Sequence, residues 1–259
     1  MQEVATTQNT LPISAAEMAE WGTKEVTSND LIIPKILLMQ GLSVMVTEGK
    51  AQLGDFRDSL TGKLVGRYDN APFEVIPFMC NEVFSIQKKD AQSGQFVYSH
   101  TEPIVKNPQR ADFNDNAPWE DKVMLDGTLT DIKRIRRYDF LVLLKSDLDS
   151  GEAVMPYLLS FKSTSVKEGK KLFNMMYVRN KAAGLLPASY MFSIAGRKEK
   201  NDKGIFIVPT VEQTTRTSPA HVKAAFDWFK RLSTTAFVAH EEDETQEPAA
   251  SDSSATGEF

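Results

Sequence analysis

Two apolar stretches determine the fold, RIRRYDFLVLL at residues 134–144 and AVMPYLLSF at residues 153–161. Both are rich in the branched and aromatic residues that favour β-strands. Between them, DLDSG at residues 147–151 supplies the Asp, Ser and Gly residues that favour turns. This order predicts an antiparallel β-hairpin with the rest of the fold built around it.

The flanking sequence adds further strands. A second hairpin is predicted from residues 190–194 and 205–209, which a basic turn at 196–204 joins. Shorter β-rich runs lie earlier in the chain, at residues 35–39, 54–58, 73–78, 82–86 and 95–98. Residues 103–119 contain three prolines and several Asn and Asp residues, and they predict a long irregular loop.

Two or three helices accompany these strands. Ser14 and Glu17 form a capping box that predicts a short helix to Trp21. A loose apolar stripe predicts a second helix from Val166 to about Ala183, and Ser218 followed by Pro219 predicts the start of a third. One face of this third helix carries Val222, Ala225, Phe226, Phe229 and Leu232. The fold class expected is β-rich α+β.

The chain is predicted to divide into three parts. Residues 1–30 form a flexible N-terminal segment with the short helix, residues 31–235 a single domain, and residues 236–259 a disordered acidic tail. The tail is too polar to bury enough surface to offset its ordering entropy. It ends in an aromatic residue, as expected of a tail whose tip docks into a partner. Its acidic and terminal residues are Glu241, Glu242, Asp243, Glu244, Glu247, Asp252, Glu258 and Phe259.

Charge is segregated along the chain. The whole sequence has 30 basic and 35 acidic residues, but residues 133–231 hold 19 basic and 9 acidic ones. Residues 1–132 are acidic, with 11 basic and 19 acidic residues. This asymmetry indicates an anionic ligand on the basic region, and it suggests that the tail can fold back there at low salt. Ordinary solvated faces are the alternative interpretation.

Several classes of function have no support in the sequence. Cys80 is the only cysteine and the three histidines are scattered, so no metal site is expected. No catalytic set or phosphate-binding loop is present, so we expect neither an enzyme nor a cofactor. The acid pairs Asp55 and Asp58, and Asp147 and Asp149, are interpreted as turn residues rather than a nuclease centre. No apolar run reaches the roughly 20 residues of a membrane span and no signal peptide is seen, which predicts a cytoplasmic protein without a membrane partner.

Basic and aromatic residues interleave at three places in the basic region, a pattern typical of proteins that bind single-stranded nucleic acid. If residues 134–144 form a strand, Arg134, Arg136, Tyr138 and Phe140 share one face. The phenylalanines of the region are better candidates for the core, and Trp119, Tyr138 and Tyr177 are the candidates for base stacking. The expected nucleic-acid-binding residues are Trp119, Lys133, Arg134, Arg136, Arg137, Tyr138, Lys162, Lys170, Lys171, Tyr177, Arg179, Lys181, Arg197, Lys198 and Lys200.

The chain has an acidic tail that ends in Phe259 and a body in which basic and aromatic residues interleave. It also carries LIIP at 31–34, GDFRD at 54–58 and PYLLSF at 156–161. In these three features the chain resembles phage single-stranded DNA-binding proteins. The resemblance implies an OB-fold-like barrel, here with helical and loop insertions. It implies sequence-independent binding of single-stranded DNA in phage replication, recombination and repair. It also implies a tail that competes with DNA and recruits replication and recombination proteins.

Three alternatives remain open at this point. A single-strand annealing protein should form rings and pair complementary strands. An interaction or virion protein should bind no oligonucleotide, and a nuclease should cleave DNA with a divalent metal. The sequence leaves homo-oligomerisation open.

Overall fold

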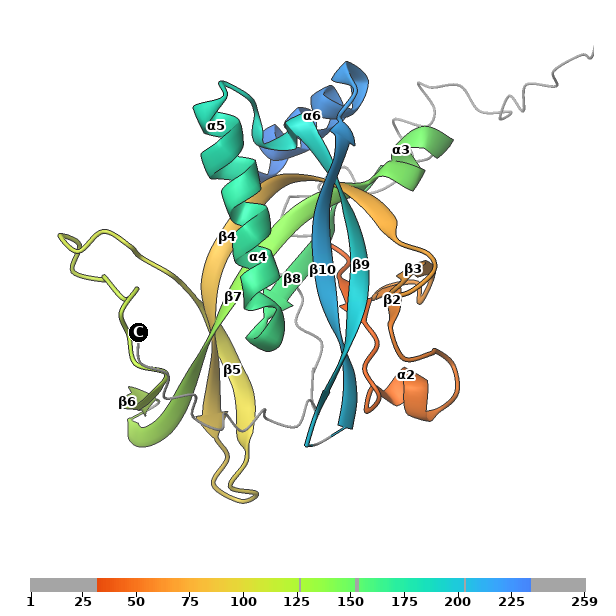
Figure 1. Cartoon of the computed structure of the whole chain (residues 1–259). Helices are drawn as coiled ribbons and strands as arrows, with labels where there is room; N and C mark the ends of the chain where they lie inside the picture. The colour runs from red at the N-terminus through yellow and green to blue at the C-terminus, as the bar shows by residue number, and fades with distance from the viewer. Residues whose placement is uncertain (1–31, 126, 152–153, 203, 234–259) are drawn as a thin grey trace, which may run out of the picture.

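Two antiparallel sheets form the framework of the protein (Figure 1). The computed structural model describes residues 32–125, 127–151, 154–202 and 204–233. In the small sheet the order is β1 (Ile36–Leu38), β2 (Asp55–Asp58) and β3 (Leu64–Arg67). The large sheet has the order β10-β9-β4-β7-β6, with β5 on β4 and β8 on β7. Its strands are β4 (Phe73–Lys89), β5 (Phe96–Pro103), β6 (Glu120–Leu125), β7 (Thr128–Leu144), β8 (Tyr157–Lys162), β9 (Tyr190–Asn201) and β10 (Gly204–Arg216).

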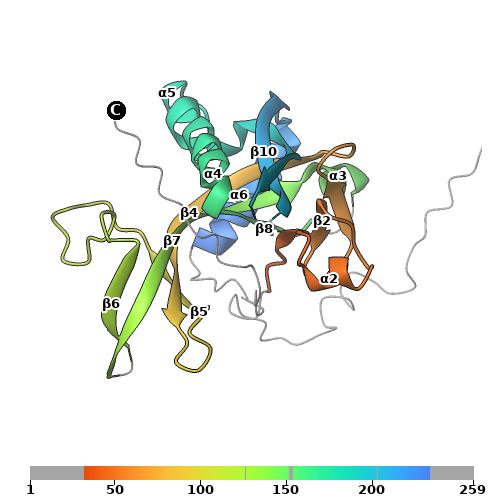
Figure 2. The ribbon, with the colours of Figure 1, turned by 60° about the horizontal axis from the view of Figure 1, so that its bottom comes forward.

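Strands β4 and β7 connect two halves of the molecule. Each has 17 residues, and they pair from Val75 and Leu144 at one end to Lys88 and Ile132 at the other. At the first end they also pair with β9 and β8, which form the body. At the second end they pair with β5 and β6, which form a four-stranded extension that we call the arm, residues 82–103 and 120–137. Figure 2 shows the arm as a lobe beside the body.

The main core lies between the large sheet, the small sheet and a long helical segment. This segment comprises α4 (Val166–Phe173), a π-helical turn at Asn174–Arg179 and α5 (Asn180–Ala182). Its apolar side chains cover one face of the body sheet, so the helix predicted over 166–183 is confirmed. The buried residues of this core include Phe56, Phe140, Phe161, Leu172, Met176 and Phe192. The expectation that the phenylalanines of the basic region are core residues is confirmed for Phe140, Phe161 and Phe192, whereas Phe173 is partly buried against this core.

A second core on the opposite sheet face is covered by α6 (Pro219–Ser233). The His221 N–H donates to Ser218 Oγ at 3.2 Å, which is the predicted cap. Ala225 and Leu232 are buried against Leu141 and Leu143 of β7. Phe226 and Phe229, predicted on one face with Ala225 and Leu232, are 47% and 39% exposed and stack on each other.

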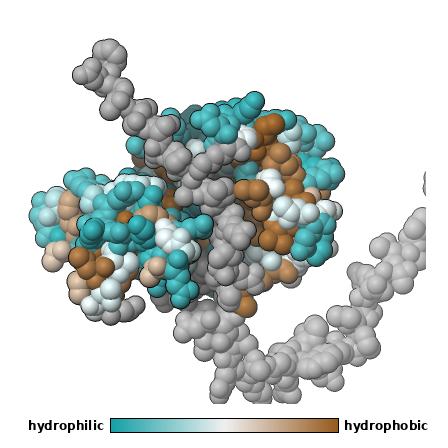
Figure 3. Space-filling model, turned by 90° about the horizontal axis from the view of Figure 1, so that it is seen from below, coloured by the Kyte–Doolittle hydropathy of each residue, from teal (hydrophilic) through white to brown (hydrophobic). Residues whose placement is uncertain are grey.

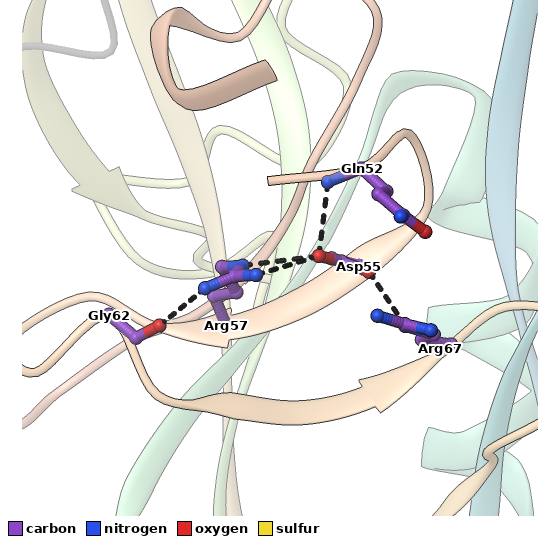
Figure 4. Close-up of polar contacts among 5 residues, drawn as sticks. All are labelled: Gln52, Asp55, Arg57, Gly62 and Arg67. Carbon is purple, nitrogen blue, oxygen red and sulfur yellow. Dashed lines mark hydrogen bonds and ion pairs between the residues drawn. The ribbon is translucent and has the colours of Figure 1, made fainter. Parts of the chain in front are cut away.

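Asp55 holds the small sheet together from a buried position (Figure 4). Its carboxylate accepts hydrogen bonds from the Gln52 N–H and from the guanidiniums of Arg57 and Arg67. Burial alone would raise the pKa of Asp55, but these three donors outweigh it and hold the pKa below its usual range. Asp58 accepts from the Leu60 N–H and the Thr61 hydroxyl. Both acids therefore have structural partners.

The two sheets touch at their edges but do not close into a barrel. β1 reaches β8 through a single bridge between Lys35 and Leu158, and the Gly196 N–H donates to Tyr68 O at 3.0 Å. Neither contact extends into a ladder. The β-rich class is confirmed, whereas the OB-fold is not.

Other differences from the sequence-based expectation are local. The hairpins β7–β8 and β9–β10 are confirmed, and residues 73–78 and 82–86 join into one strand. Strand β6 and the first residues of β7 were not predicted. The predicted turn at 147–151 contains a short helix, α3 (Lys145–Ser150). Further short helical elements are α2 (Val44–Thr47), Ser163–Ser165 and Pro187–Ser189. The predicted helix at 14–21 and the acidic tail lie outside the described residues.

Candidate nucleic-acid interface

The arginine row predicted on β7 is engaged by β6 and by the loop that precedes it. Arg134 donates to Asp121 Oδ2 at 2.9 Å and to Pro118 O at 3.2 Å. Arg136 pairs with the Asp115 carboxylate and lies 3.3 Å from Glu82 Oε1. The loop at residues 104–119 thereby closes over Phe84, Ile86 and Ile132, which form a small core in the arm. These two arginines hold the loop in place and do not form an open phosphate-binding row.

Glu82 is the buried acid beneath this loop. Its side chain is only 8% exposed and pairs with Lys106 of the loop as well as with Arg136. It lies opposite Tyr138 in the β4–β7 register. Burial, and then the neighbouring Glu82 carboxylate, raise the pKa of Tyr138 to about 12.

Arg137 faces the other side of β7 and is also buried. Its Nε lies 2.9 Å from Asp139 Oδ1, and the Ser160 hydroxyl donates to the same oxygen at 2.7 Å. Thr101 of β5 lies 3.4 Å from the Arg137 guanidinium. Arg137, predicted to contact DNA, is therefore not an exposed cation: it is 7% exposed and its charge is paired with the buried Asp139 carboxylate.

The three candidate stacking rings have different environments. Tyr138 is 3% exposed under Phe173, so the expectation of a free ring face is wrong. Tyr177 is half-buried on Phe173, and its hydroxyl accepts the Cys80 N–H at 3.1 Å. Burial raises the pKa of Tyr177 to about 12. Trp119 is 44% exposed at the end of the loop, as predicted for this ring.

A second group of predicted cations lies together on one flank of the body. Lys171 Nζ donates to Val211 O at 2.6 Å, and Arg179 donates to Gln213 at 3.3 Å, so the helical segment follows the edge of β10. The exposed members of this basic flank are Lys170, Lys171, Arg179, Lys181, Arg197, Lys198 and Lys200. Arg197 pairs with Glu199 and Lys171 with Glu168, whereas the remaining lysines have no ion-pair partner among the described residues.

Lys133 belongs to a surface that the sequence did not reveal. In the arm, Tyr98, Gln87, Lys133 and Glu120 lie in one row across four strands. Residues directly opposite in an antiparallel sheet share a face, so these side chains project together. Phe96 and Lys89 form the next row, and Lys133 Nζ lies 4.4 Å from the Phe96 ring centroid.

We call this surface the arm face and define it by Lys89, Phe96, Tyr98, Lys122 and Lys133. Tyr98 is 42% exposed, and the side chains of Lys89 and Lys122 are 49% and 69% exposed. The same face carries two acids in surface ion pairs: Asp131 lies 4.0 Å from Lys89 and 3.5 Å from Lys122, and Glu120 lies 3.0 Å from Lys133. Such exposed pairs contribute at most about 1 kcal/mol each, so a phosphate can replace the acid. The small core of the arm and its covering loop lie on the opposite face. The sequence at 95–98 places Phe96 and Tyr98 two residues apart, as in a strand with one aromatic face. Only the strand register shows that these two rings lie beside lysines from three other positions.

Other chemistry has little basis in the described part of the chain. In the parts of the chain that the structure describes, no cluster of His, Cys, Asp and Glu is arranged to hold a metal ion. Burial raises the pKa of the Cys80 thiol, which disfavours the reactive thiolate. None of the helices described has both the length and the apolar character needed to cross a bilayer.

Comparison with known proteins places the chain in a phage family. No curated protein and no solved structure matches it. A family model described as "Pam3 phage gp34-like protein" matches residues 5–237, which is most of the chain and includes both the body and the arm. The chain therefore belongs to the Pam3 phage gp34-like family of phage proteins.

Proposed function

We propose that this phage protein binds single-stranded DNA without sequence preference and serves DNA replication, recombination and repair without being an enzyme. The arm face is the observation that supports this proposal. It presents the exposed Tyr98 ring and the partly buried Phe96 ring among Lys89, Lys122 and Lys133, whose surface ion pairs with Asp131 and Glu120 are weak enough for a phosphate to replace. A base can stack on a ring while the lysines neutralise the adjacent phosphates.

The basic flank supplies a second set of phosphate contacts in this proposal. Its lysines on α4, α5 and β9 carry charge that no described acid neutralises, as at Lys170, Lys181, Lys198 and Lys200. Contacts with phosphates release counterions, so affinity for DNA should fall as salt rises. Each lost phosphate contact should reduce the slope of log K against log salt by about 0.7 for a single strand.

Fluorescence anisotropy of a labelled oligo(dT), with a duplex competitor, tests the proposal. Tyr98→Ala should weaken binding about tenfold, because stacking on one ring contributes about 1–3 kcal/mol. Phe226→Ala is the matched control, since Phe226 is an equally exposed ring on α6 of the body. Its affinity should equal that of the unmodified protein.

Two double variants test whether the lysines contact phosphates. K89A/K122A should lower the salt slope by about 1.4, whereas K223A/K230A on α6 should leave it unchanged. Absence of oligo(dT) binding at low salt, including after removal of residues 241–259, would overturn the proposal and favour an interaction protein. Pairing of complementary strands in an annealing assay would instead identify an annealing protein.

The acidic tail completes the proposed function. Residues 241–259 would compete with DNA for the cationic surfaces and recruit replication and recombination proteins in the host cytoplasm. The support for this role is the charge of the tail and the aromatic Phe259 at its end. Pull-down of host and phage replication proteins by the full chain, but not by the chain ending at residue 240, is the expected result.

A further inference from the structure

A largely apolar groove of about 440 Å³ opens between β1, α2, β8 and β10. Its walls include Ile36, Leu38 and Met45 on one side and Leu158 and Ile207 on the other. Seen from below, hydrophobic side chains gather in a band on the body (Figure 3). The groove lies apart from the arm face, so a segment can occupy it whether or not the arm binds DNA.

The groove exposes more apolar surface than packing of the fold explains. Ile32, Leu42, Val44 and Leu60 line it and are 49%, 60%, 62% and 56% exposed. Contiguous exposed apolar side chains of this size mark a binding surface in soluble proteins. A segment with large apolar side chains would gain about 25 cal/mol for each Å² of such surface that it covers.

The charge of the groove restricts its occupant. Lys35 and Lys162 are among the lining residues, and no Asp or Glu is. The hydroxyls of Ser163 and Thr164 add hydrogen-bonding groups at one end. The groove therefore favours a segment that combines large apolar side chains with acidic ones.

We propose that the N-terminal residues 13–21 of the same chain occupy this groove. They read ISAAEMAEW, with Ile13, Met18 and Trp21 as apolar anchors and Glu17 and Glu20 as the acids that complement the two lysines. In a helix that begins after Ser14, Glu17, Glu20 and Trp21 would share one face, and Met18 would lie next to Trp21, so the acids and these apolar anchors can meet the groove together. This segment has the composition that the groove selects.

The point of attachment distinguishes this segment from other candidates. The described chain begins at Ile32, which itself lines the groove. Residues 22–31 form a tether that spans at most roughly 35 Å, which keeps the segment at a high local concentration. The acidic tail is also complementary in charge, but the described chain ends with α6 at Ser233, and no residue of α6 lines the groove.

Hydrogen exchange of the full chain and of a chain lacking residues 1–30 tests the proposal. Docking for about nine-tenths of the time should slow exchange in residues 36–47 and 158–165 about tenfold relative to the deleted chain. Residues 96–103 in the arm are the internal control and should exchange equally in both. Equal exchange in the groove segments of both chains would overturn the proposal, as would a loss of protection on deleting residues 241–259 instead.

Cross-linking identifies which copy supplies the segment. In a Cys80→Ala background, Met18→Cys with Leu42→Cys should form a disulfide within one chain, because Leu42 is 60% exposed on the groove. The control pair, Met18→Cys with Met124→Cys, uses a residue that is 65% exposed at the tip of the arm and should not cross-link. A disulfide-linked dimer would assign the groove to a second copy and contradict docking within the chain.

Discussion

Gly169 of α4 lies directly over Tyr138 of β7, and a Cβ added at position 169 would lie 3.1 Å from the Tyr138 Cβ. The same Cβ would lie 2.7 Å from the Phe161 Cβ, which is closer than carbon atoms can pack. Because both neighbours are attached to strand backbone, they cannot move aside. Glycine at this position lets the helix approach the sheet and bury the ring that the sequence had suggested for base stacking.

Gly169→Ala should therefore destabilise the protein although alanine favours helices. The gain in helix propensity is about 1 kcal/mol, and overpacking costs about 1–3 kcal/mol together with a shift of the helix. A lower midpoint in urea unfolding is expected. Lys170→Ala, on the exposed side of the same helix, is the control and should leave the midpoint nearly unchanged. A midpoint for Gly169→Ala at or above the native value would show that the helix can move away without loss.

The loop at residues 104–119 should depend on Glu82. Glu82→Gln removes the buried charge that pairs with Lys106 and Arg136, and we expect a loss of about 1–3 kcal/mol in stability. Trypsin should then cut faster after Lys106 and Arg110, since both lie in the released loop.

Glu120→Gln provides the comparison for this loop. Glu120 pairs with Lys133 at the surface, where its side chain is 63% exposed, and such pairs contribute at most about 1 kcal/mol. Trypsin should cleave the Glu120→Gln variant at the same rate as the unmodified protein. Equal cleavage of the Glu82 and Glu120 variants would mean that Glu82 does not hold the loop.

The strands could be predicted from the sequence where the signal is local. Residues 134–144 and 190–209 carry their β propensity and turn residues within a short stretch, and both hairpins formed as expected. The exposure of Trp119 followed from its polar, proline-rich surroundings. The burial of Tyr138 could not be predicted in this way, because it depends on the distant Gly169.

The candidate site was harder to predict because pairing with acids, distant in one case and local in another, decides which charges remain available. Arg136 meets Asp115, 21 residues earlier, and Arg137 is neutralised by Asp139, only two residues along the same strand. Counting charges in the sequence cannot distinguish these paired arginines from Lys198, which has no ion-pair partner among the described residues. The arm face likewise exists only because the register places Tyr98 in the row of Gln87 and Lys133.

Asp55 should make stability depend on acid pH. Its pKa is lowered in the folded protein, so its contribution is present above the ordinary Asp pKa of about 3.9 and is lost as pH falls through the native value. Asp55→Asn removes this carboxylate from Arg57 and Arg67, and breaking a buried ion pair costs about 3 kcal/mol. The melting temperature near neutral pH should fall by about 2–4 °C for each kcal/mol.

The pH dependence separates charge from shape at this position. As pH falls from about 5 to about 2, the melting temperature of the unmodified protein should approach that of Asp55→Asn, because protonation below the ordinary Asp pKa removes the same charge. Glu48→Gln is the control, since Glu48 pairs with Lys50 at the surface. A gap between native and Asp55→Asn that stays constant over this range would assign the loss to geometry alone.

Removal of the acidic tail should tighten binding of oligo(dT) at low salt. The tail holds seven acidic residues and no basic one, and attraction between it and the basic flank is strongest when the Debye length is long. The dissociation constant of the full chain divided by that of the chain lacking residues 241–259 should fall as salt rises from about 0.01 M to about 0.2 M. Salt screens the attraction between the tail and the basic flank, so the tail competes less, and it also weakens DNA binding by both chains. A chain whose seven tail acids are replaced by Asn and Gln separates charge from length and should behave like the deletion. If the deletion binds more weakly or equally at low salt, competition by the tail is excluded, and its role would be limited to the recruitment of partners.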